Sequence, residues 1–418
     1  MKILRLPAYF EPEQVASTHL WHDFSETVAK VGIETVVYTP VPSRGVSNEI
    51  RKEYKRKKTE HFYGGKLVVH RFSLIKEGKN PTLRALRYFL QSIKQFNRGA
   101  FSKDARECDA IFIVSTPPIQ GAMASLLKKF RHIPLVYNLQ DIFPDSLIGT
   151  GLAPRGGLLW RIGRAIEDFT YYNADIIIVI SEDFKRNIMA KGVPEEKIEV
   201  IYNWVDADAV RPVAKEDNPL FEEFGLSLDA FTVVYAGNLG NAQNIDIILE
   251  GAKKLPQVQF AVFGTGGLED DIRARIAHEH LDNVRLLPLQ PYERVSQVYS
   301  LGDVCIVSCK AGLGGSAMPS KTWSIMSCAR PVLASFDEGE LKRILESNHC
   351  GVFTHAGNVQ EFADAIHHLS ESPSLCEEMG RNARMFIEEN LTKEVGTQKY
   401  IDVIKSLEKK NSQYEYEA

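Results

Sequence analysis

The sequence predicts an α/β protein built from two doubly wound domains with parallel sheets. Short apolar runs alternate with amphipathic helical patterns along nearly the whole chain, which is the rhythm of βαβ units. The length of 418 residues exceeds one ordinary domain and suggests two domains of about 200 residues each. A polar, proline-containing stretch at 211–219 lies near the middle of the chain and is the best candidate for a linker.

The composition is typical of a globular protein from a reducing compartment. Apolar residues make up 44% of the chain and charged residues 25%, and the net charge of −4 argues against a dedicated nucleic-acid binder. The six cysteines are scattered without a CxxC pair, so we expect buried free thiols and no metal site. We expect neither a secretory signal nor a membrane span, and hence a protein of the cytoplasm or of a membrane surface.

The first half of the chain predicts an N-terminal domain over residues 1–207. We expect a first strand with its exit loop at 3–10, and further strands at 35–38, 110–114, 135–137, 175–180 and 198–202. We expect helices at 14–31, 80–104, 119–130, 156–172 and 182–191. The stretch 44–64 is polar and rich in lysine and arginine, and we expect an inserted loop there.

The helix expected at 80–104 mixes apolar side chains with five lysines and arginines. Some of the apolar positions must pack on the sheet, but the excess of aromatics and cations also fits a helix that faces an anionic membrane. Two interpretations stay open for this helix and for the basic stretch 44–64. Either one of them contacts a membrane, or both are ordinary solvated surface.

The second half predicts a C-terminal domain over residues 208–392. We expect strands at 231–236, 259–263, 284–287, 303–308, 331–335 and 351–354. We expect helices at 244–255, 268–279, 292–300, 322–328, 358–371 and 374–389, followed by a last helix at 393–410 that packs on something through its apolar positions.

The stretch 312–331 is the strongest candidate for a binding site. It joins a glycine loop to Pro319, Ser320 and Lys321 at the start of the expected helix 322–328. Ser320 is expected to cap this helix, and Lys321 adds positive charge where free N–H groups already favour anions. This predicts a seat for a phosphate or diphosphate. The simpler interpretation is an ordinary capped helix with a solvated lysine.

Further loops follow the carboxyl ends of parallel strands within each domain, which is where open α/β sheets bind their ligands. They are the glycine-containing loops 237–243 and 264–267 of the second domain, and the polar segment 140–145 of the first.

Taken together, these segments resemble the GT-B glycosyltransferases, and within them the family-4 retaining enzymes of the WbuB-like branch. The motifs that carry the resemblance are Tyr9-Phe10-x-Pro12-Glu13, 140–146, 201–206, 236–240 with Gln243, and 319–331. The resemblance implies a GT-B fold, in which two Rossmann-like domains face a central cleft. It also implies that the last segment, 393–418, crosses back to the N-terminal domain.

The branch includes bacterial O-antigen and capsule enzymes that transfer N-acetylfucosamine. The resemblance therefore implies a metal-independent, retaining hexosyltransferase-type enzyme without a cofactor, whose substrate is a UDP-sugar. The acceptor would be a saccharide linked to undecaprenyl diphosphate. We then expect a cytoplasmic protein that is peripheral on the inner face of the cytoplasmic membrane and binds no nucleic acid.

The resemblance also assigns roles to residues. Lys321 would stabilise the leaving diphosphate, and Asp141 or Glu13 would orient the acceptor hydroxyl in the N-terminal domain. The histidines His19 and His22 are expected to be structural. The residues expected to bind the donor are Gly237, Asn238, Gly240, Gln243, Gly264, Arg285, Leu286, Gly314, Gly315, Ser316, Ser320, Lys321 and Glu340.

The sequence departs from the family pattern at charged positions. Asn238 and Gln243 stand where many members have an arginine and a lysine, and Ser316 and Ser324 stand where they have two glutamates. Gln140 stands where many have a histidine. A diphosphate removed from water still needs a compensating charge, so Lys321 is expected to supply it, ahead of Lys310 and Arg330.

Two alternatives follow from the missing charges. One is a catalytically inactive GT-B subunit that binds a nucleotide sugar or a partner enzyme, which the absent glutamate pair favours. The other is a GT-B sugar-nucleotide epimerase, which would need a carboxylate and histidine cluster that the sequence does not offer.

Overall fold

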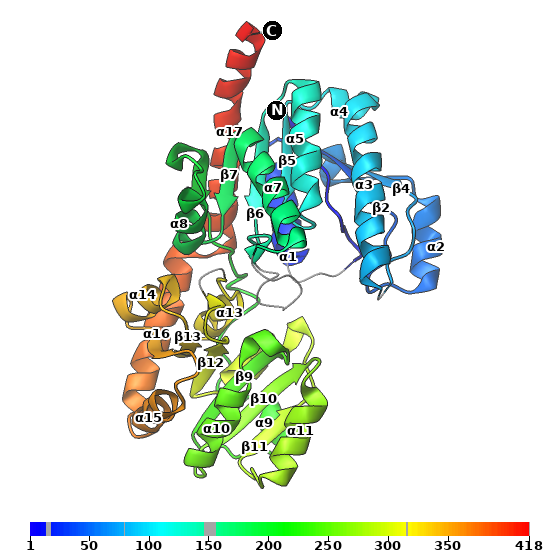
Figure 1. Ribbon diagram of the computed structural model, residues 1–418. Coiled ribbons are helices and arrows are strands. Elements are labelled where there is room, and N and C mark those ends of the chain that lie inside the picture. Colours follow the sequence, from blue (N-terminus) through cyan, green and yellow to red (C-terminus); the bar gives the residue numbers. More distant parts are fainter. Residues whose placement is uncertain (14–17, 79, 146–155, 315–316, 418) are drawn as a thin grey trace. The chain divides into compact units, whose positions relative to one another are not determined.

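The computed structural model describes residues 1–13, 18–78, 80–145, 156–314 and 317–417, and it describes their side chains except those of 81 and 408–417. The chain forms two compact α/β units (Figure 1). Unit 1 comprises Met1–Tyr202 and Gly396–Ala418, and unit 2 comprises Asn203–Val395. This is the architecture expected from the alternation of apolar strands and amphipathic helices.

Unit 1 contains an eight-stranded sheet in the order β3-β4-β2-β1-β5-β6-β7-β8, in which all neighbours are parallel except β3 and β4. Its strands are β1 (Lys2–Arg5), β2 (Glu34–Pro40), β3 (Thr59–Phe62), β4 (Leu67–Phe72), β5 (Ala110–Val114), β6 (Leu135–Leu139), β7 (Ile176–Val179) and β8 (Ile198–Val200). Its helices are α1 (Thr18–Lys30), α2 (Asn48–Arg56), α3 (Pro81–Phe101), α4 (Lys103–Arg106), α5 (Ile119–Arg131), α7 (Leu158–Asn173) and α8 (Glu182–Ala190). The inner strands β5 and β7 are entirely apolar, which is typical of parallel strands covered by helices on both faces.

The basic stretch 44–64 is structured, so the prediction of an inserted loop was wrong. Ser47 caps α2 by accepting a hydrogen bond from the backbone N–H of Ile50. The buried Arg51 donates to the carbonyl oxygens of Val41, Pro42 and Leu74, which ties α2 to the sheet. β3 then pairs antiparallel with β4. The many charges of α2 lie on its solvated side, and this disguised the helix in the sequence.

Unit 2 contains a six-stranded parallel sheet in the order β11-β10-β9-β12-β13-β14. Its strands are β9 (Thr232–Asn238), β10 (Gln259–Thr265), β11 (Val284–Leu287), β12 (Val304–Ser308), β13 (Val332–Phe336) and β14 (Gly351–His355). Its helices are α9 (Leu220–Glu223), α10 (Asp246–Lys254), α11 (Glu269–His278), α12 (Val295–Ser300), α13 (Lys321–Ser327), α14 (Glu340–Ser347), α15 (Val359–Ser370) and α16 (Pro373–Asn390). The core of this unit is a continuous apolar cluster between α10, α15 and the sheet.

The expected linker 211–219 belongs to unit 2. The backbone N–H groups of Arg211 and Val213 donate to the hydroxyls of Ser296 and Ser300, at 3.1 and 3.0 Å. The division between the units falls between Tyr202 and Asn203 rather than after 207. The reason is a backbone hydrogen bond of 3.1 Å from Val205 to the carbonyl of Leu391, which fastens the residues after Tyr202 to the end of α16.

The last helix, α17 (Lys393–Glu417), returns to unit 1, which confirms the expected crossing. Tyr400 is buried there, with its ring centroid 5.6 Å from that of Phe24 and 6.0 Å from that of Phe112. The side-chain amide of Asn138 donates to the Tyr400 hydroxyl at 2.5 Å. No helix in the described part of the chain is both long enough and apolar enough to cross a bilayer. The six cysteines are all buried and free.

Candidate functional site

Two glycine loops lie side by side at the carboxyl edge of the unit 2 sheet. The register of β9 and β10 sets Gly237 opposite Gly264. A Cβ on Gly264 would lie 2.4 Å from the Gly237 carbonyl oxygen, and a Cβ on Gly266 would lie 2.4 Å from that of Leu239. Any side chain at Gly264 or Gly266 would force these loops apart, so glycine is required for their close approach.

Lys321 brings its ammonium group to these loops. It is the first residue of α13, and its Nζ lies 2.6 Å from the point that a Cβ on Gly237 would occupy. Gly237 has a φ of 150°, which residues with a side chain rarely adopt, so its bare backbone leaves room for the ammonium. The structure therefore brings together two residues that are far apart in the sequence and were both predicted to bind the donor.

The charge of Lys321 is uncompensated among the described residues. Its Nζ lies 4.1 Å from the centroid of the Tyr235 ring, and no described carboxylate or hydrogen-bond acceptor pairs with it. Burial lowers the pKa of Lys321 to about 8, because desolvation disfavours the protonated form. An ammonium held in this way attracts any anion that can reach the Gly237 loop.

Tyr235 is a site residue that the sequence prediction missed. Its hydroxyl donates to the backbone carbonyl of Asn238 at 2.8 Å, and its fully buried ring lies beneath the Lys321 ammonium. A cation–π contact contributes only about 0.5–2 kcal/mol, so the ring holds the lysine in place without neutralising it. The available signal was spacing, because Tyr235 precedes Gly237 by two positions in a strand and therefore shares its face.

Asn238 and Gln243 stand at the two positions where many family-4 enzymes have an arginine and a lysine. Asn238 Nδ2 donates to Gln243 Oε1 at 3.3 Å, and Gly240 packs tightly against both side chains. Ser308, at the end of β12, anchors this loop to the sheet, because its hydroxyl donates to the carbonyl of Gln243 at 2.6 Å. These residues offer hydrogen bonds to a ligand but no charge, so Lys321 is the charged group of this loop pair.

Ser320 does not cap α13, so that prediction was wrong. Its backbone is already helical, and its side chain makes no capping hydrogen bond. The physical reason is a turn that begins earlier, with Thr322 N–H donating to the Pro319 carbonyl at 3.0 Å and Trp323 N–H donating to the Ser320 carbonyl.

The Gly314 loop is held by a carboxylate that the sequence prediction overlooked. Asp337 accepts hydrogen bonds from the backbone N–H groups of Gly312 and Gly314, at 3.0 and 2.7 Å. The Gly314 N–H is therefore bonded within the protein, and the predicted contact of Gly314 with the donor stays a prediction. Gly315 and Ser316, which were also predicted to bind the donor, lie outside the described residues.

The remaining predicted donor contacts differ in their surroundings. Arg285 is exposed on β11, and Leu286 beside it packs partly against the unit 2 core. Glu340 is buried at the start of α14. Of the two alternative cations, Lys310 is exposed and Arg330 donates to the carbonyl of Ser300 at 3.1 Å. Neither therefore takes the place of Lys321 beside Gly237.

The predicted acids of unit 1 lie in different environments. Asp141 is exposed directly after β6, and its backbone N–H approaches the Ser115 hydroxyl at 3.4 Å. Glu13 is 1% exposed, and its Oε1 accepts the backbone N–H groups of Ser43 and Arg44 at 2.7 and 2.8 Å. Desolvation raises the pKa of Glu13. Glu13 thus fixes the backbone after β2, whereas Asp141 is accessible.

The histidines of α1 were expected to be structural. His22 is exposed and pairs with Glu11 at 2.9 Å. His19 lies near the beginning of the same helix.

Comparison with known proteins agrees with this architecture. Residues 18–209 match the Glycosyltransferase Family 4 domain, and residues 217–386 match the Glycosyl transferases group 1 domain. The chain is 25% identical over 325 residues to WbjE of Pseudomonas aeruginosa, named as a probable glycosyltransferase, a match that covers 76% of this chain and 78% of WbjE. It is 28% identical over 207 residues to WcaI of Escherichia coli, whose name assigns it to colanic acid biosynthesis, covering 48% of this chain and 51% of WcaI.

A solved structure shows the same fold over nearly the whole chain. The crystal structure of Anabaena HepE in complex with UDP superposes with a TM-score of 0.73 at 18% identity, covering 97% of this chain and all of HepE. The two domain matches follow one another in the order of units 1 and 2 and together extend from residue 18 to residue 386. The chain is therefore a GT-B glycosyltransferase, with a family 4 domain followed by a group 1 domain.

Proposed function

We propose that this glycosyltransferase moves a sugar from a UDP-sugar to a lipid-linked saccharide during the synthesis of a bacterial surface polysaccharide. The name of WcaI, which refers to colanic acid biosynthesis, supports the polysaccharide assignment. The name of WbjE supports glycosyl transfer, and HepE, crystallised with UDP, supports the nucleotide. Membership of the WbuB-like branch, O-antigen or capsule as the product, and N-acetylfucosamine as the sugar rest on the sequence motifs. The proposed acceptor carries undecaprenyl diphosphate.

The observation that carries the proposal is the uncompensated ammonium of Lys321 beside the Gly237 loop. A diphosphate bound there would return to the ammonium the favourable interactions that burial has removed, and would raise its pKa again. The same contact strengthens during reaction, because negative charge grows on the diphosphate as the bond to the sugar breaks. Lys321 would thus stabilise the transition state, in which the nucleotide leaves the sugar, more than it stabilises the bound substrate.

The proposed reaction retains the configuration of the sugar and uses no metal ion or cofactor. The Gly237 and Gly264 loops would hold the donor, with Asn238 and Gln243 as neutral hydrogen-bonding partners. Asp141 is the better candidate for orienting the acceptor hydroxyl, because Glu13 already serves two backbone N–H groups. The departing phosphate would accept the hydroxyl proton.

The test is the turnover of Lys321→Ala with a panel of UDP-sugars and a lipid-linked acceptor. We expect a loss of about 100-fold or more, which is the scale for removing one donor to a developing oxyanion. Lys254→Ala is the control, since Lys254 is an exposed lysine of unit 2 that bonds Gln360 away from the loops. Near-normal turnover of Lys321→Ala would contradict the proposal.

The same panel separates the alternatives. Melting shifts with UDP-sugars but no transfer to any acceptor would indicate an inactive binding subunit. Conversion of the donor without acceptor would indicate an epimerase.

A further inference from the structure

The long helix α3 has its polar side buried and its apolar side exposed. The exposed fractions of Leu86, Phe89 and Ile93 are 48%, 52% and 44%, and Leu83 and Phe101 are more exposed still. With about 3.6 residues per turn, these five positions fall within roughly one third of the helix circumference. A surface helix of a globular protein normally buries its apolar side and exposes its polar side. The exposed apolar side of α3 therefore indicates a surface that binds a partner or a membrane.

A buried network of polar side chains holds α3 in this rotation. Gln95 Nε2 donates to the carbonyl oxygens of Pro7 and Tyr38, at 2.9 and 3.0 Å, and Gln95 Oε1 accepts from Gln120 at 2.8 Å. About two turns earlier, the 1% exposed Arg87 donates to the Ser43 hydroxyl and the Ile75 carbonyl. Turning α3 to bury its leucines would break this network, so the exposed apolar face is fixed by the interior of unit 1.

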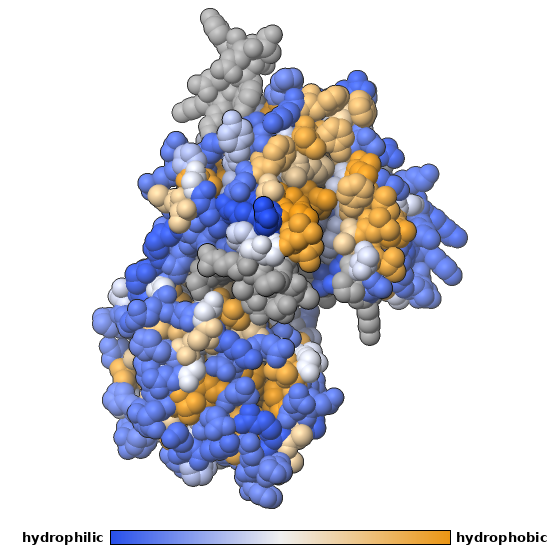
Figure 2. All heavy atoms as spheres, in the orientation of Figure 1, coloured by the Kyte–Doolittle hydropathy of each residue, from blue (hydrophilic) through white to orange (hydrophobic). Residues whose placement is uncertain are grey.

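The apolar face continues over α5 and α7. Phe130 of α5 lies against Phe101 of α3 with ring centroids 5.4 Å apart, and Lys129 of α5 lies 5.1 Å from the ring of Phe169 on α7. At the beginning of α7, Leu158 and its two apolar neighbours 159 and 162 are exposed by 49–75%. Figure 2 shows apolar surface, coloured orange, in the region where Figure 1 places α3, α5 and α7.

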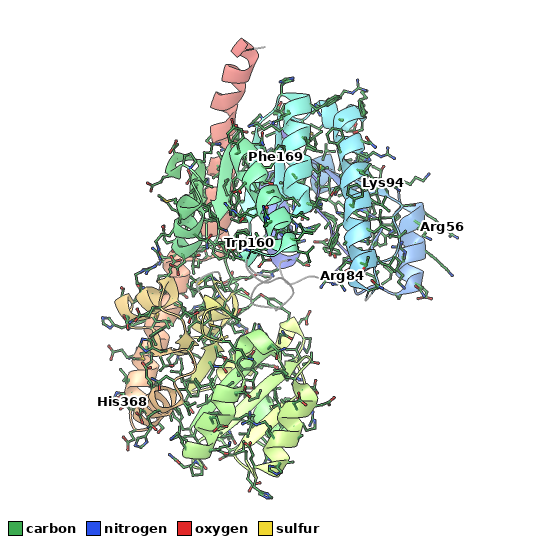
Figure 3. The ribbon with its side chains drawn as sticks, in the orientation of Figure 1. Arg56, Arg84, Lys94, Trp160, Phe169 and His368 are labelled. Carbon is green, nitrogen blue, oxygen red and sulfur yellow. The ribbon has the colours of Figure 1, made fainter. Side chains whose placement is uncertain are left out.

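The exposed side of the three helices is positively charged. Of their nine lysines and arginines, Arg87 is buried and Lys128 pairs with Asp175, and four are exposed, namely Lys94, Arg98, Lys129 and Arg161. The three helices contain only two acids. The two acids, Glu167 and Asp168, both pair with Arg164. Arg84 and Lys94 project from α3, and Trp160 and Phe169 lie on α7 (Figure 3). Exposed apolar side chains surrounded by cations are the chemistry that binds an anionic lipid surface.

We propose that the outer face of α3, α5 and α7 docks unit 1 onto an anionic phospholipid bilayer, with the apolar side chains in the interfacial layer. A second copy of the chain is a poorer occupant, because a symmetric dimer would press two positive faces together. The inference deepens the proposed function and rests on it, since a lipid-linked acceptor must be collected at such a surface.

The test is flotation of the full chain with vesicles of phosphatidylcholine alone and with vesicles containing roughly one third phosphatidylglycerol. Wild type should bind the anionic vesicles and release them at high salt. Replacing Leu86, Phe89 and Ile93 together by serine should weaken binding at least about tenfold. Lys94→Gln and Arg98→Gln should each weaken it about fivefold.

The matched control is Leu289→Ser with Tyr292→Ser, which removes two similarly exposed apolar side chains, 51% and 47%, from unit 2. We expect it to bind vesicles like wild type. Melting shifts with UDP should be equal in all variants, which verifies folding and an intact donor site.

Equal vesicle binding by wild type and the triple serine variant would overturn the proposal, as would equal binding to neutral and anionic vesicles. Loss of a wild-type dimer in the triple variant would assign the face to self-association instead. Docking can fail while Lys321→Ala still abolishes transfer, so failure here is distinguishable from failure of the proposed function.

Discussion

Both units have a mostly parallel sheet, but a helix of unit 1 and a helix of unit 2 bury opposite kinds of side chain. In unit 2, α10 buries Ile247, Ile248 and Leu249 against the sheet, as amphipathic helices normally do. In unit 1, α3 buries Arg87, Gln91 and Gln95 and exposes its leucines. Among the described residues, sixteen large apolar side chains are exposed in unit 1 and four in unit 2. Two α/β units with mostly parallel sheets therefore differ in their surfaces, since large apolar side chains are exposed mainly on unit 1.

The units also differ in where their charged groups are satisfied. The carboxylate of Glu13 in unit 1 accepts hydrogen bonds from two backbone N–H groups of its own unit. Lys321 of unit 2 has no charged or hydrogen-bonding partner among the described residues. This difference makes Lys321, rather than Glu13, the candidate for binding an oppositely charged ligand.

The sharpest way to break the comparison is to truncate one side chain in each unit. Ile248→Ala should destabilise unit 2 by about 2–5 kcal/mol, because it opens a cavity in a fully buried core. Leu86→Ala on α3 should change the stability of unit 1 by less than about 0.5 kcal/mol. Hydrogen exchange resolved by segment would measure each unit separately, and equal losses in both units would show that the face of α3 is part of the core.

The next largest effect concerns pH. The pKa of Lys321 is about 8 in the folded chain, below its ordinary value of 10.5, so the unfolded chain binds more protons between these pH values. Stability should therefore rise from pH 8 to pH 10.5, by at most about 3 kcal/mol, and should be insensitive to this lysine below pH 8.

Lys321→Met is the control, since it should lack this rise in thermal unfolding experiments. UDP affinity should fall above pH 8 in wild type, as the ammonium loses its proton. A difference between wild type and Lys321→Met that does not change with pH would contradict the placement of Lys321 in a desolvated environment.

A smaller effect would sharpen the account of α3. Gln95→Leu should destabilise unit 1 by about 2 kcal/mol, because the carbonyls of Pro7 and Tyr38 lose their donor inside the protein. Asn97→Leu, at an exposed position of the same helix, should be neutral. Urea denaturation of both variants would measure this, and a neutral Gln95→Leu would mean that the network does not fix the rotation of α3.

Much of the fold was predictable because parallel sheets leave a strong signal. The apolar strand Ile176–Val179 and the amphipathic pattern of α10 were recognisable from local periodicity alone. The prediction was wrong for 44–64, where α2 and β3 are stabilised by Arg51 and by pairing with β4, which are contacts distant in sequence. The prediction that Ser320 caps α13 rested on its residue type alone, and the turn that begins one residue earlier, at Pro319, makes Ser320 part of the helix instead.

The sequence by itself determined the two α/β units and the glycine loops that follow β9 and β10, because hydrophobic period and glycine placement are local properties of the chain. Only the tertiary structure decided that Lys321 stands beside Gly237 over the Tyr235 ring, and that Asp337 already occupies the Gly314 N–H. It also decided which side of α3 faces outward. The physical reason is that desolvation, pairing of charges and the rotation of a helix depend on neighbours contributed by distant segments, which no local pattern contains.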